Sequence, residues 1–230
     1  MHSTYYSDRK LETEVHKFLI KHKVYEQLFN GHPETVEDAR LQKLGADVII
    51  GNTVVDEKAA VAWAGANSCR RNFAAEYYNF TSHNPGWIIR PNVITTHYLQ
   101  IFIYLKDFYT NEDRRTNRKF KCDDILALDL LLIDKEKFKD YVSSRLSDDV
   151  IMAELTDMHE RGIKYKLVSG IELRVSYALH EVPAIITVSA DKLESVNVAN
   201  KYYVYHAKGT VFDGFYVGDV KHEPSDGLSS

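Results

Sequence analysis

The stretch from Ala46 to Ala59, which reads ADVIIGNTVVDEKA, constrains the fold more than any other part of the chain. A run of β-branched residues follows Asp47, and the pair Gly51-Asn52 is typical of a two-residue hairpin turn. A second run of strand-forming residues follows that turn. The pattern predicts a strand over 46–50, a tight turn, and an antiparallel partner strand over 53–59.

Charged side chains gather on one face of this predicted hairpin. Asp56 and Lys58 share a face because successive strand residues point to opposite sides, whereas Glu57 points the other way and is expected to be structural. The turn should bring Asp47 close to Lys58. Carboxylate oxygens are the ligands that Mg²⁺ prefers, and it needs only one or two of them. The pattern therefore indicates either a metal site with a lysine beside it or an ordinary surface hairpin with solvated charges.

A long amphipathic helix is predicted upstream, from about Ser7 to Asn30, where Gly31 and Pro33 end it. Its apolar stripe includes Leu11, Val15 and Phe18 at helical spacing, and Glu14 lies at the edge of that stripe. Two interpretations of Glu14 stay open. It is either a further ligand of the carboxylate site or a core-edge acid paired with a neighbouring Lys or His.

The rest of the chain alternates between strand-like and helix-like segments without a repeat or a linker. Strands are predicted over 73–80, 95–105, 125–133, 171–179, 184–188, 201–206 and 211–217, and helices over 135–145 and 148–161. This order predicts an α+β or mixed α/β fold, in which helices flank a mixed sheet and further strands follow at the C-terminal end. We expect one domain over 1–222 and a disordered tail over 223–230.

The order of Asp47, the turn and Asp56-Glu57-Lys58 resembles the PD-(D/E)XK nuclease superfamily, which includes restriction endonucleases, phage exonucleases and Holliday-junction resolvases. Ala46 replaces the Pro of the family motif. The run GADVII…VDEKA, with Phe73-Ala-Ala-Glu76 and Gly86-Trp87 downstream, is similar to uncharacterised bacterial and phage members. The resemblance implies a restriction-endonuclease-like core and hydrolysis of DNA phosphodiester bonds with Mg²⁺ or Mn²⁺. It also implies Asp47 and Asp56 as metal ligands, Lys58 as catalytic, and Glu14 as a catalytic and metal-binding acid.

The charge balance limits how the chain could meet nucleic acid. There are 29 Lys and Arg against 33 Asp and Glu, and the resulting net charge of −4 argues against a passive basic coat but not against an enzyme with an acidic centre. Basic residues that could contact phosphates cluster in two places, and their alternative role is a solvated loop. They are Arg70 and Arg71, followed by Arg114, Arg115, Arg118, Lys119 and Lys121.

Other features bound the remaining possibilities. Two cysteines without a CxxC pair exclude a zinc ribbon, and no signal-peptide pattern opens the chain, so we expect a cytoplasmic protein without a membrane partner. A homodimer is possible. Two other functions stay open: a non-catalytic DNA- or protein-binding accessory protein of phage or mobile-element origin that keeps the fold, and an α+β protein without any nucleic-acid role.

Overall fold

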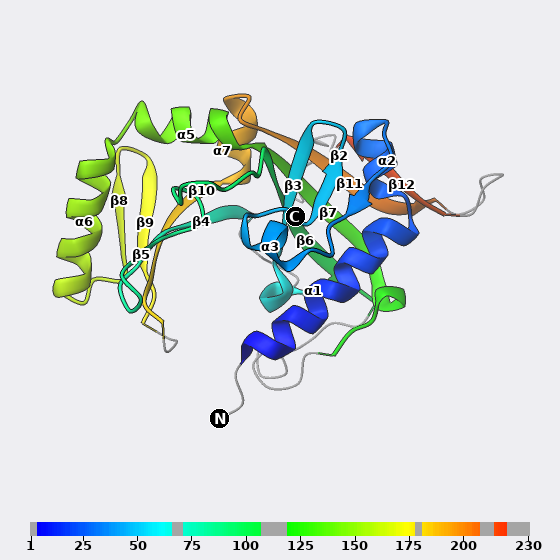
Figure 1. Cartoon of the computed structure of the whole chain (residues 1–230), viewed down its shortest axis with the longest axis horizontal. Helices are drawn as coiled ribbons and strands as arrows, with labels where there is room; N and C mark the ends of the chain where they lie inside the picture. Colours follow the sequence, from blue (N-terminus) through cyan, green and yellow to red (C-terminus); the bar gives the residue numbers. More distant parts are fainter. Residues whose placement is uncertain (1–3, 66–70, 107–118, 178–180, 208–213, 220–230) are drawn as a thin grey trace, which may run out of the picture.

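Two β-sheets organise the computed structural model, which describes residues 4–65, 71–106, 119–177, 181–207 and 214–219 (Figure 1). The large sheet has the order β1-β2-β3-β6-β7-β11-β12, and the small sheet has the order β5-β4-β10-β9-β8. Helices flank both sheets, and the last strands extend the large sheet. The predicted mixed α/β class is therefore confirmed.

The strands of the large sheet are β1 (Glu34–Thr35), β2 (Val48–Ile50), β3 (Thr53–Ala59), β6 (His97–Leu105), β7 (Ile125–Asp134), β11 (Ala199–Ala207) and β12 (Gly214–Asp219). Those of the small sheet are β4 (Asn72–Asn79), β5 (Asn84–Pro85), β8 (Tyr165–Val168), β9 (Ile171–Val175) and β10 (Pro183–Ser189). Neighbouring strands run antiparallel among the described residues, except for β3 and β6, which are parallel.

The helices are α1 (Thr4–Lys21), α2 (Val24–Phe29), α3 (Ala39–Lys43), α5 (Lys135–Ser143), α6 (Asp148–Glu160) and α7 (Ala190–Ser195), with short 3₁₀ turns η1 (Val61–Trp63) and η2 (Cys122–Asp124). Within the described part of the chain, no helix is long and apolar enough to cross a membrane.

The predicted hairpin forms where the sequence places it. Ile50 pairs with Thr53 across the turn, and Gly51 adopts a left-handed backbone with φ of 57°. A Cβ at this position would meet nothing within 4 Å, so glycine is favoured by the backbone conformation and not by crowding. The hairpin fixes the register of the acidic residues on either side of it.

The predicted helix over 7–30 is wrong as a single element. Lys23 has a left-handed backbone with φ of 52°, and the chain breaks there into α1 and α2. The break lets Val24 and Tyr25 at the start of α2 turn into the core, where both are fully buried. Tertiary packing therefore overrides a continuous local helical pattern.

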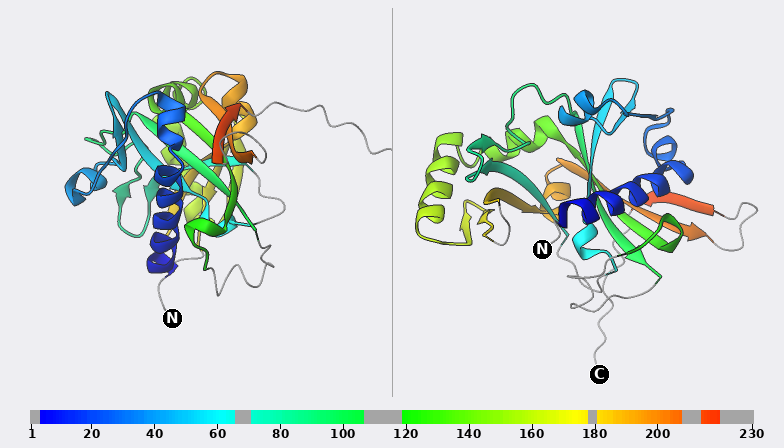
Figure 2. Two further views of the ribbon diagram at one scale, coloured as in Figure 1. Left: turned by 90° about the vertical axis from the view of Figure 1, so that its right-hand side faces the viewer. Right: turned by 60° about the horizontal axis from the view of Figure 1, so that its bottom comes forward.

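Helix α1 lies on one face of the large sheet and the small sheet on the other (Figure 2), and the buried residues on the two faces form separate cores. One core lies under α1 and α2 and includes Leu99, Ile101 and Leu128. The other lies between the large sheet, the small sheet, α5 and α6, and includes Tyr98, Leu131 and Ile133. Consecutive residues of β6 and β7 thus belong to opposite cores, as strand alternation requires.

Several short elements were not predicted. They are β1, β5, β8 and α7, together with the two 3₁₀ turns. Helix α7 is capped by Ser189, whose side chain accepts a hydrogen bond from the backbone N–H of Lys192, a local signal too short to stand out in the sequence. The predicted tail over 223–230 lies outside the described residues.

Candidate functional site

Asp56 and Lys58 form an ion pair on the face of β3 that looks toward the small sheet. Lys58 Nζ lies 2.7 Å from Asp56 Oδ1, and the Asp56 side chain is only 8% exposed against 30% for Lys58. The Lys58 ammonium also sits 4.7 Å from the centre of the Trp87 ring, a cation–π distance. The pair is therefore anchored on its inner side and open to solvent at the lysine.

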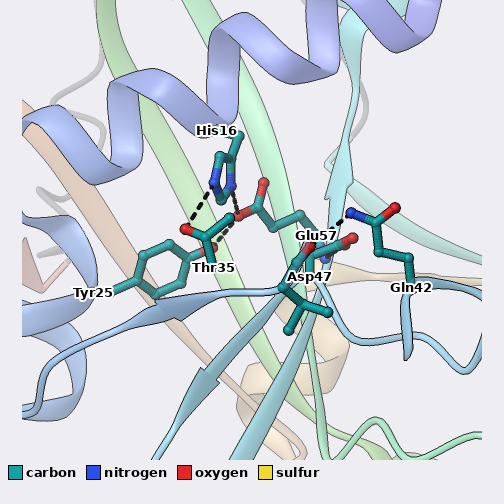
Figure 3. A network of polar contacts seen from close by, with 7 residues as sticks. His16, Tyr25, Thr35, Gln42, Asp47 and Glu57 are labelled. Carbon is teal, nitrogen blue, oxygen red and sulfur yellow. Dashed lines mark hydrogen bonds and ion pairs between the residues drawn. The ribbon is translucent and has the colours of Figure 1, made fainter. Parts of the chain in front are cut away.

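Asp47 lies opposite this pair on the other arm of the hairpin, just before β2. Its backbone N–H donates to Val55 O at 2.9 Å, and its Oδ2 accepts a 2.8 Å hydrogen bond from the backbone N–H of Glu57 (Figure 3). The Asp47 and Asp56 carboxylates are within hydrogen-bonding reach of each other. The hairpin register therefore places Asp47 directly across from Asp56. The sequence predicted a position close to Lys58, which is two residues further along β3.

Electrostatic crowding at Asp56 follows from this arrangement. Burial raises the pKa of Asp56 to about 6, Lys58 opposes the shift, and the neighbouring Asp47 carboxylate adds to it. Lys58 is thus insufficient to balance the buried negative charge. Two adjacent carboxylates either share a proton or gain from a cation placed between them.

A glycine makes the close packing around Asp56 possible. Gly45 has φ of +80°, and a Cβ there would lie 2.3 Å from Thr95 Oγ1 and 3.5 Å from Asp56 Oδ2. Thr95 in turn donates from its hydroxyl to Gly45 O at 2.6 Å. Any larger residue at position 45 would press on the wall that holds Asp56.

Glu14 does not join the site, so its interpretation as a further ligand is wrong, and the alternative of a core-edge acid paired with a neighbouring lysine is confirmed. Its carboxylate binds Lys17 at 2.7 Å and accepts from the backbone N–H of Cys122 at 3.0 Å. The hydrogen bond from Lys17, reinforced by that from Cys122, lowers the pKa of Glu14. Glu14 therefore ties α1 to η2, on the opposite side of the apolar stripe from the hairpin.

Glu12 is the acid of α1 that faces the hairpin. Part of its side chain is exposed, yet desolvation by the surrounding protein raises its pKa, while nearby Lys58 opposes the shift and Asp47 adds to it. With about 100° between successive helix residues, Glu12 and Glu14 flank Leu11 on opposite sides. Which of these two acids reaches the site depends on the side of α1 against which the hairpin packs.

Glu57 belongs to a second polar network on the α1 face of the sheet (Figure 3). Its Oε1 lies 2.7 Å from His16 Nδ1 and accepts a 2.5 Å hydrogen bond from the Tyr25 hydroxyl. The other ring nitrogen of His16 lies 3.3 Å from Thr35 Oγ1. Glu57 therefore holds α1 and α2 to β3, as expected for a structural residue.

The spacing of Glu12 and His16 in the sequence indicates that both face the same polar neighbour. They stand four residues apart and so lie on the same side of α1, next to the stripe that includes Leu11 and Val15. Polar residues repeated at this spacing beside a core stripe indicate a polar neighbour. The sequence prediction considered only Glu14.

Two further residues take positions near the site. Gln42 donates from Nε2 to Val36 O at 2.7 Å and so braces the chain before Asp47 (Figure 3). Glu76 lies on β4 and is influenced electrostatically by Lys58. Burial raises its pKa, Glu181 adds to the shift, and Arg90 and Lys58 oppose it.

The predicted phosphate-binding residues fall mostly outside this region. Arg71 is held by Asp129 and by the Tyr104 hydroxyl, each at 2.5 Å. Arg71 therefore lies on the same face of the large sheet as Lys58. It is next to Tyr104, four residues after Gln100, the residue of β6 that pairs with Lys58. Lys119 and Lys121 are exposed. Arg70, Arg114, Arg115 and Arg118 lie outside the described residues.

The metal-binding capacity of the site rests on few donors. Among the described residues, no group of three or more His, Cys, Asp and Glu side chains is arranged to hold a metal ion. Asp47 and Asp56 still offer adjacent carboxylates, which is the donor chemistry and the number that Mg²⁺ requires. The Tyr98 hydroxyl, on the strand beside Asp56, is buried without a hydrogen-bond partner among the described residues. These residues fit a Mg²⁺ ion that keeps most of its waters.

Comparisons with family models, curated proteins and solved structures gave no match to this chain, so the functional argument rests on the geometry of the site.

Proposed function

We propose that this protein is a Mg²⁺- or Mn²⁺-dependent nuclease of the PD-(D/E)XK type that hydrolyses DNA phosphodiester bonds. The observation that carries the proposal is the Asp56–Lys58 ion pair on β3, with the Asp47 carboxylate against it across the hairpin. Adjacent carboxylates would hold a metal ion, and a partly exposed lysine beside them would stabilise the negative charge that builds on the phosphate during hydrolysis.

Each residue has a distinct role in this proposal. Asp47 and Asp56 would hold the metal, and the backbone N–H of Glu57 fixes the orientation of Asp47. Lys58 would leave its ion pair with Asp56 to stabilise charge on the phosphate or to orient the attacking water. Glu12, and not Glu14, would face the substrate from α1. A bound Mg²⁺ supplies charge neutralisation and makes water a stronger nucleophile.

The proposal is tested by nicking of supercoiled plasmid in Mg²⁺, Mn²⁺ or EDTA. Lys58→Ala and Asp56→Asn should each lower the rate by about 10²–10³ or more, because each removes a group that acts on the transition state. Lys139→Ala is the matched control, since Lys139 forms an exposed ion pair with Glu136 at 3.4 Å on α5. Equal rates for wild type and Lys58→Ala would contradict the proposal.

Metal binding is measured separately from activity. Mn²⁺ should raise the melting temperature of the wild type and not that of Asp47→Asn or Asp56→Asn. Asp157→Asn, which removes an exposed partner of Arg161, should keep the wild-type response. A response that survives both site variants would place the metal elsewhere.

A non-catalytic DNA- or protein-binding accessory protein with the same fold is the second candidate. It is favoured by the small number of metal donors, because no group of three lies together within the described residues. In that case the wild type should bind DNA or a protein partner without cleaving any DNA or RNA form. The plasmid assay with a parallel gel-shift measurement distinguishes the two candidates.

A further inference from the structure

A groove of about 660 Å³ opens between the two sheets, directly after the strand that carries Lys58. Its walls come from the N-terminal part of α1, the segment from Ala59 to Trp63, β6, and the facing strands of the small sheet. Glu12 lines the groove and also faces Lys58 and Asp47. The groove therefore lies next to the candidate site, and Gln100 in its wall is hydrogen-bonded to the backbone of Lys58.

The groove combines an apolar wall with a few polar groups. Alanines 59, 60, 62 and 74, with Val61 and Phe102, form the apolar part. Gln100, which lines the groove, donates from Nε2 to Lys58 O at 2.7 Å. Asn72 and Thr187 add an amide and a hydroxyl, and the buried Thr187 hydroxyl has no partner among the described residues. Mostly apolar walls with a few polar groups are typical of small-ligand sites, where the polar groups fix the orientation of the ligand.

Trp63 stands at the wall of this groove on η1, which packs beside α1 (Figure 2). Trp63 is 56% exposed, which is unusually high for a residue with the largest apolar side chain. An exposed indole ring offers a flat surface for stacking, and nucleobases stack on aromatic rings whatever their identity. Trp63 follows Lys58 by one short turn of chain, so a stacked base would belong to the strand at the site.

The size and charge of the groove decide which part of a nucleic acid could enter. Its volume lies within the roughly 300–1,000 Å³ range of small-ligand sites and is far too small for a duplex. Asp8 and Glu12 on one wall repel phosphate, and Arg174 on the other is already paired with Glu172 at 3.0 Å. An uncharged base suits this interior better than the phosphate backbone.

We propose that this groove binds one unpaired nucleobase of the strand whose phosphate lies at Lys58, with Trp63 stacking on the base. The inference rests on the proposed nuclease function and narrows its substrate to single-stranded or locally unpaired nucleic acid. Gln100 and Asn72 would meet the polar edge of the base. The acidic wall keeps the backbone at the mouth, near Lys58.

The test measures binding of a short labelled oligothymidylate to the full chain in Ca²⁺, with a gel to verify that the strand stays intact. Trp63→Ala should weaken binding roughly five- to hundredfold, the usual effect of removing one stacking ring, and Trp63→Phe should restore part of it. An abasic strand of equal length and a blunt duplex should bind wild type and Trp63→Ala equally. Tyr165→Ala, at a 72% exposed aromatic residue on β8, is the control.

Tryptophan fluorescence gives a second readout that does not depend on affinity. Oligothymidylate should quench wild-type emission more strongly than that of Trp63→Phe, whose remaining signal comes from Trp87 beside Lys58. Equal binding of oligothymidylate by folded wild type and Trp63→Ala would overturn the inference. So would an absence of single-strand binding, or quenching by a lysine-rich peptide and not by the strand.

The two proposals can fail independently. If Lys58→Ala cleaves plasmid as fast as wild type while Trp63→Ala still loses single-strand binding, the base site stands and the nuclease proposal falls. If Lys58 is required for cleavage while Trp63→Ala binds the strand normally, the nuclease proposal stands and the base site falls.

Discussion

Asp56 is a carboxylate whose ionisation is opposed by its surroundings. Its folded-state pKa is raised from 3.8 to about 6, with burial as the main cause. The folded protein therefore holds this proton more tightly than the unfolded chain does. Between about pH 4 and pH 6 the folded state loses stability as pH rises, and the loss is complete above pH 6.

Asp56→Asn should consequently stabilise the metal-free protein at pH 8, and the gain should shrink as pH falls from about 6 to 4. The upper bound is on the order of 3 kcal/mol, from the size of the pKa shift. Urea unfolding in EDTA at several pH values measures it. Asp157→Asn, at an exposed ion pair, should change stability by less than about 0.5 kcal/mol. A variant less stable than wild type at pH 8 would show that Lys58 outweighs burial.

Among single residues, the sequence predicts the group on the hairpin and misses the group on the helix. Strand alternation predicts that Asp56 and Lys58 share a face, and the hairpin turn predicts that Asp47 comes close to them, although its register sets Asp47 across from Asp56 and not near Lys58. Glu12 and Glu14 both border the same apolar stripe, and the choice between them depends on which side of α1 the hairpin docks. That is a long-range packing outcome with no local signature.

At the scale of elements, the His16–Glu57 contact joins α1 to β3 over a distance of 2.7 Å. The hydrogen bond to Glu57 raises the pKa of His16, and desolvation opposes the shift. A raised histidine pKa stabilises the folded state fully below the unfolded value of 6.5, and this contribution is lost as pH rises through the folded pKa.

His16→Gln should therefore cost more stability at pH 5.5 than at pH 8.5, about 1–3 kcal/mol against less than about 1 kcal/mol. Thermal or urea unfolding of both proteins at the two pH values provides the comparison. Lys17→Gln, at the neighbouring exposed Lys17–Glu14 pair, serves as the control. An equal cost at both pH values would mean that His16 is uncharged throughout.

The elements themselves were predictable where their signal was local. The hairpin, β6 and β7 follow from dense β-branched and apolar runs, and the end of α6 follows from Gly162 directly after it. The break of the first helix at Lys23 was not predictable, because the burial of Tyr25 beside Glu57 causes it. The division into two sheets depends on pairings such as β4 with β10, which link distant segments.

At the scale of the whole molecule, two cores share one sheet. Leu19 lies in the core under α1 and Leu155 of α6 in the core beside the small sheet, and both are fully buried. Adjacent residues Tyr98 and Leu99 of β6 contribute to opposite cores. Both cores therefore depend on the same strands, β6 and β7. If one core is disrupted, these strands lose packing on one face, and the other core is destabilised as well.

Leu19→Ala and Leu155→Ala should each cost about 2–5 kcal/mol, and each variant should still unfold in a single transition. Far-UV circular dichroism and tryptophan fluorescence should give coincident urea curves, with the midpoint lowered to a similar degree in both. Separate transitions in either variant would show that the two cores unfold independently.

The parallel pairing of β3 with β6 has a consequence for the order in which the chain acquires its parts. A parallel pair needs a long crossover connection, and this one carries β4, which pairs with β10 much later in the chain. The hairpin that carries Asp47, Asp56 and Lys58 can form early during synthesis because its contacts are local. The groove beside it cannot form until β10, which supplies part of its wall, has left the ribosome. In an unfinished chain Asp47, Asp56 and Lys58 would therefore be brought together before the proposed base-binding groove exists.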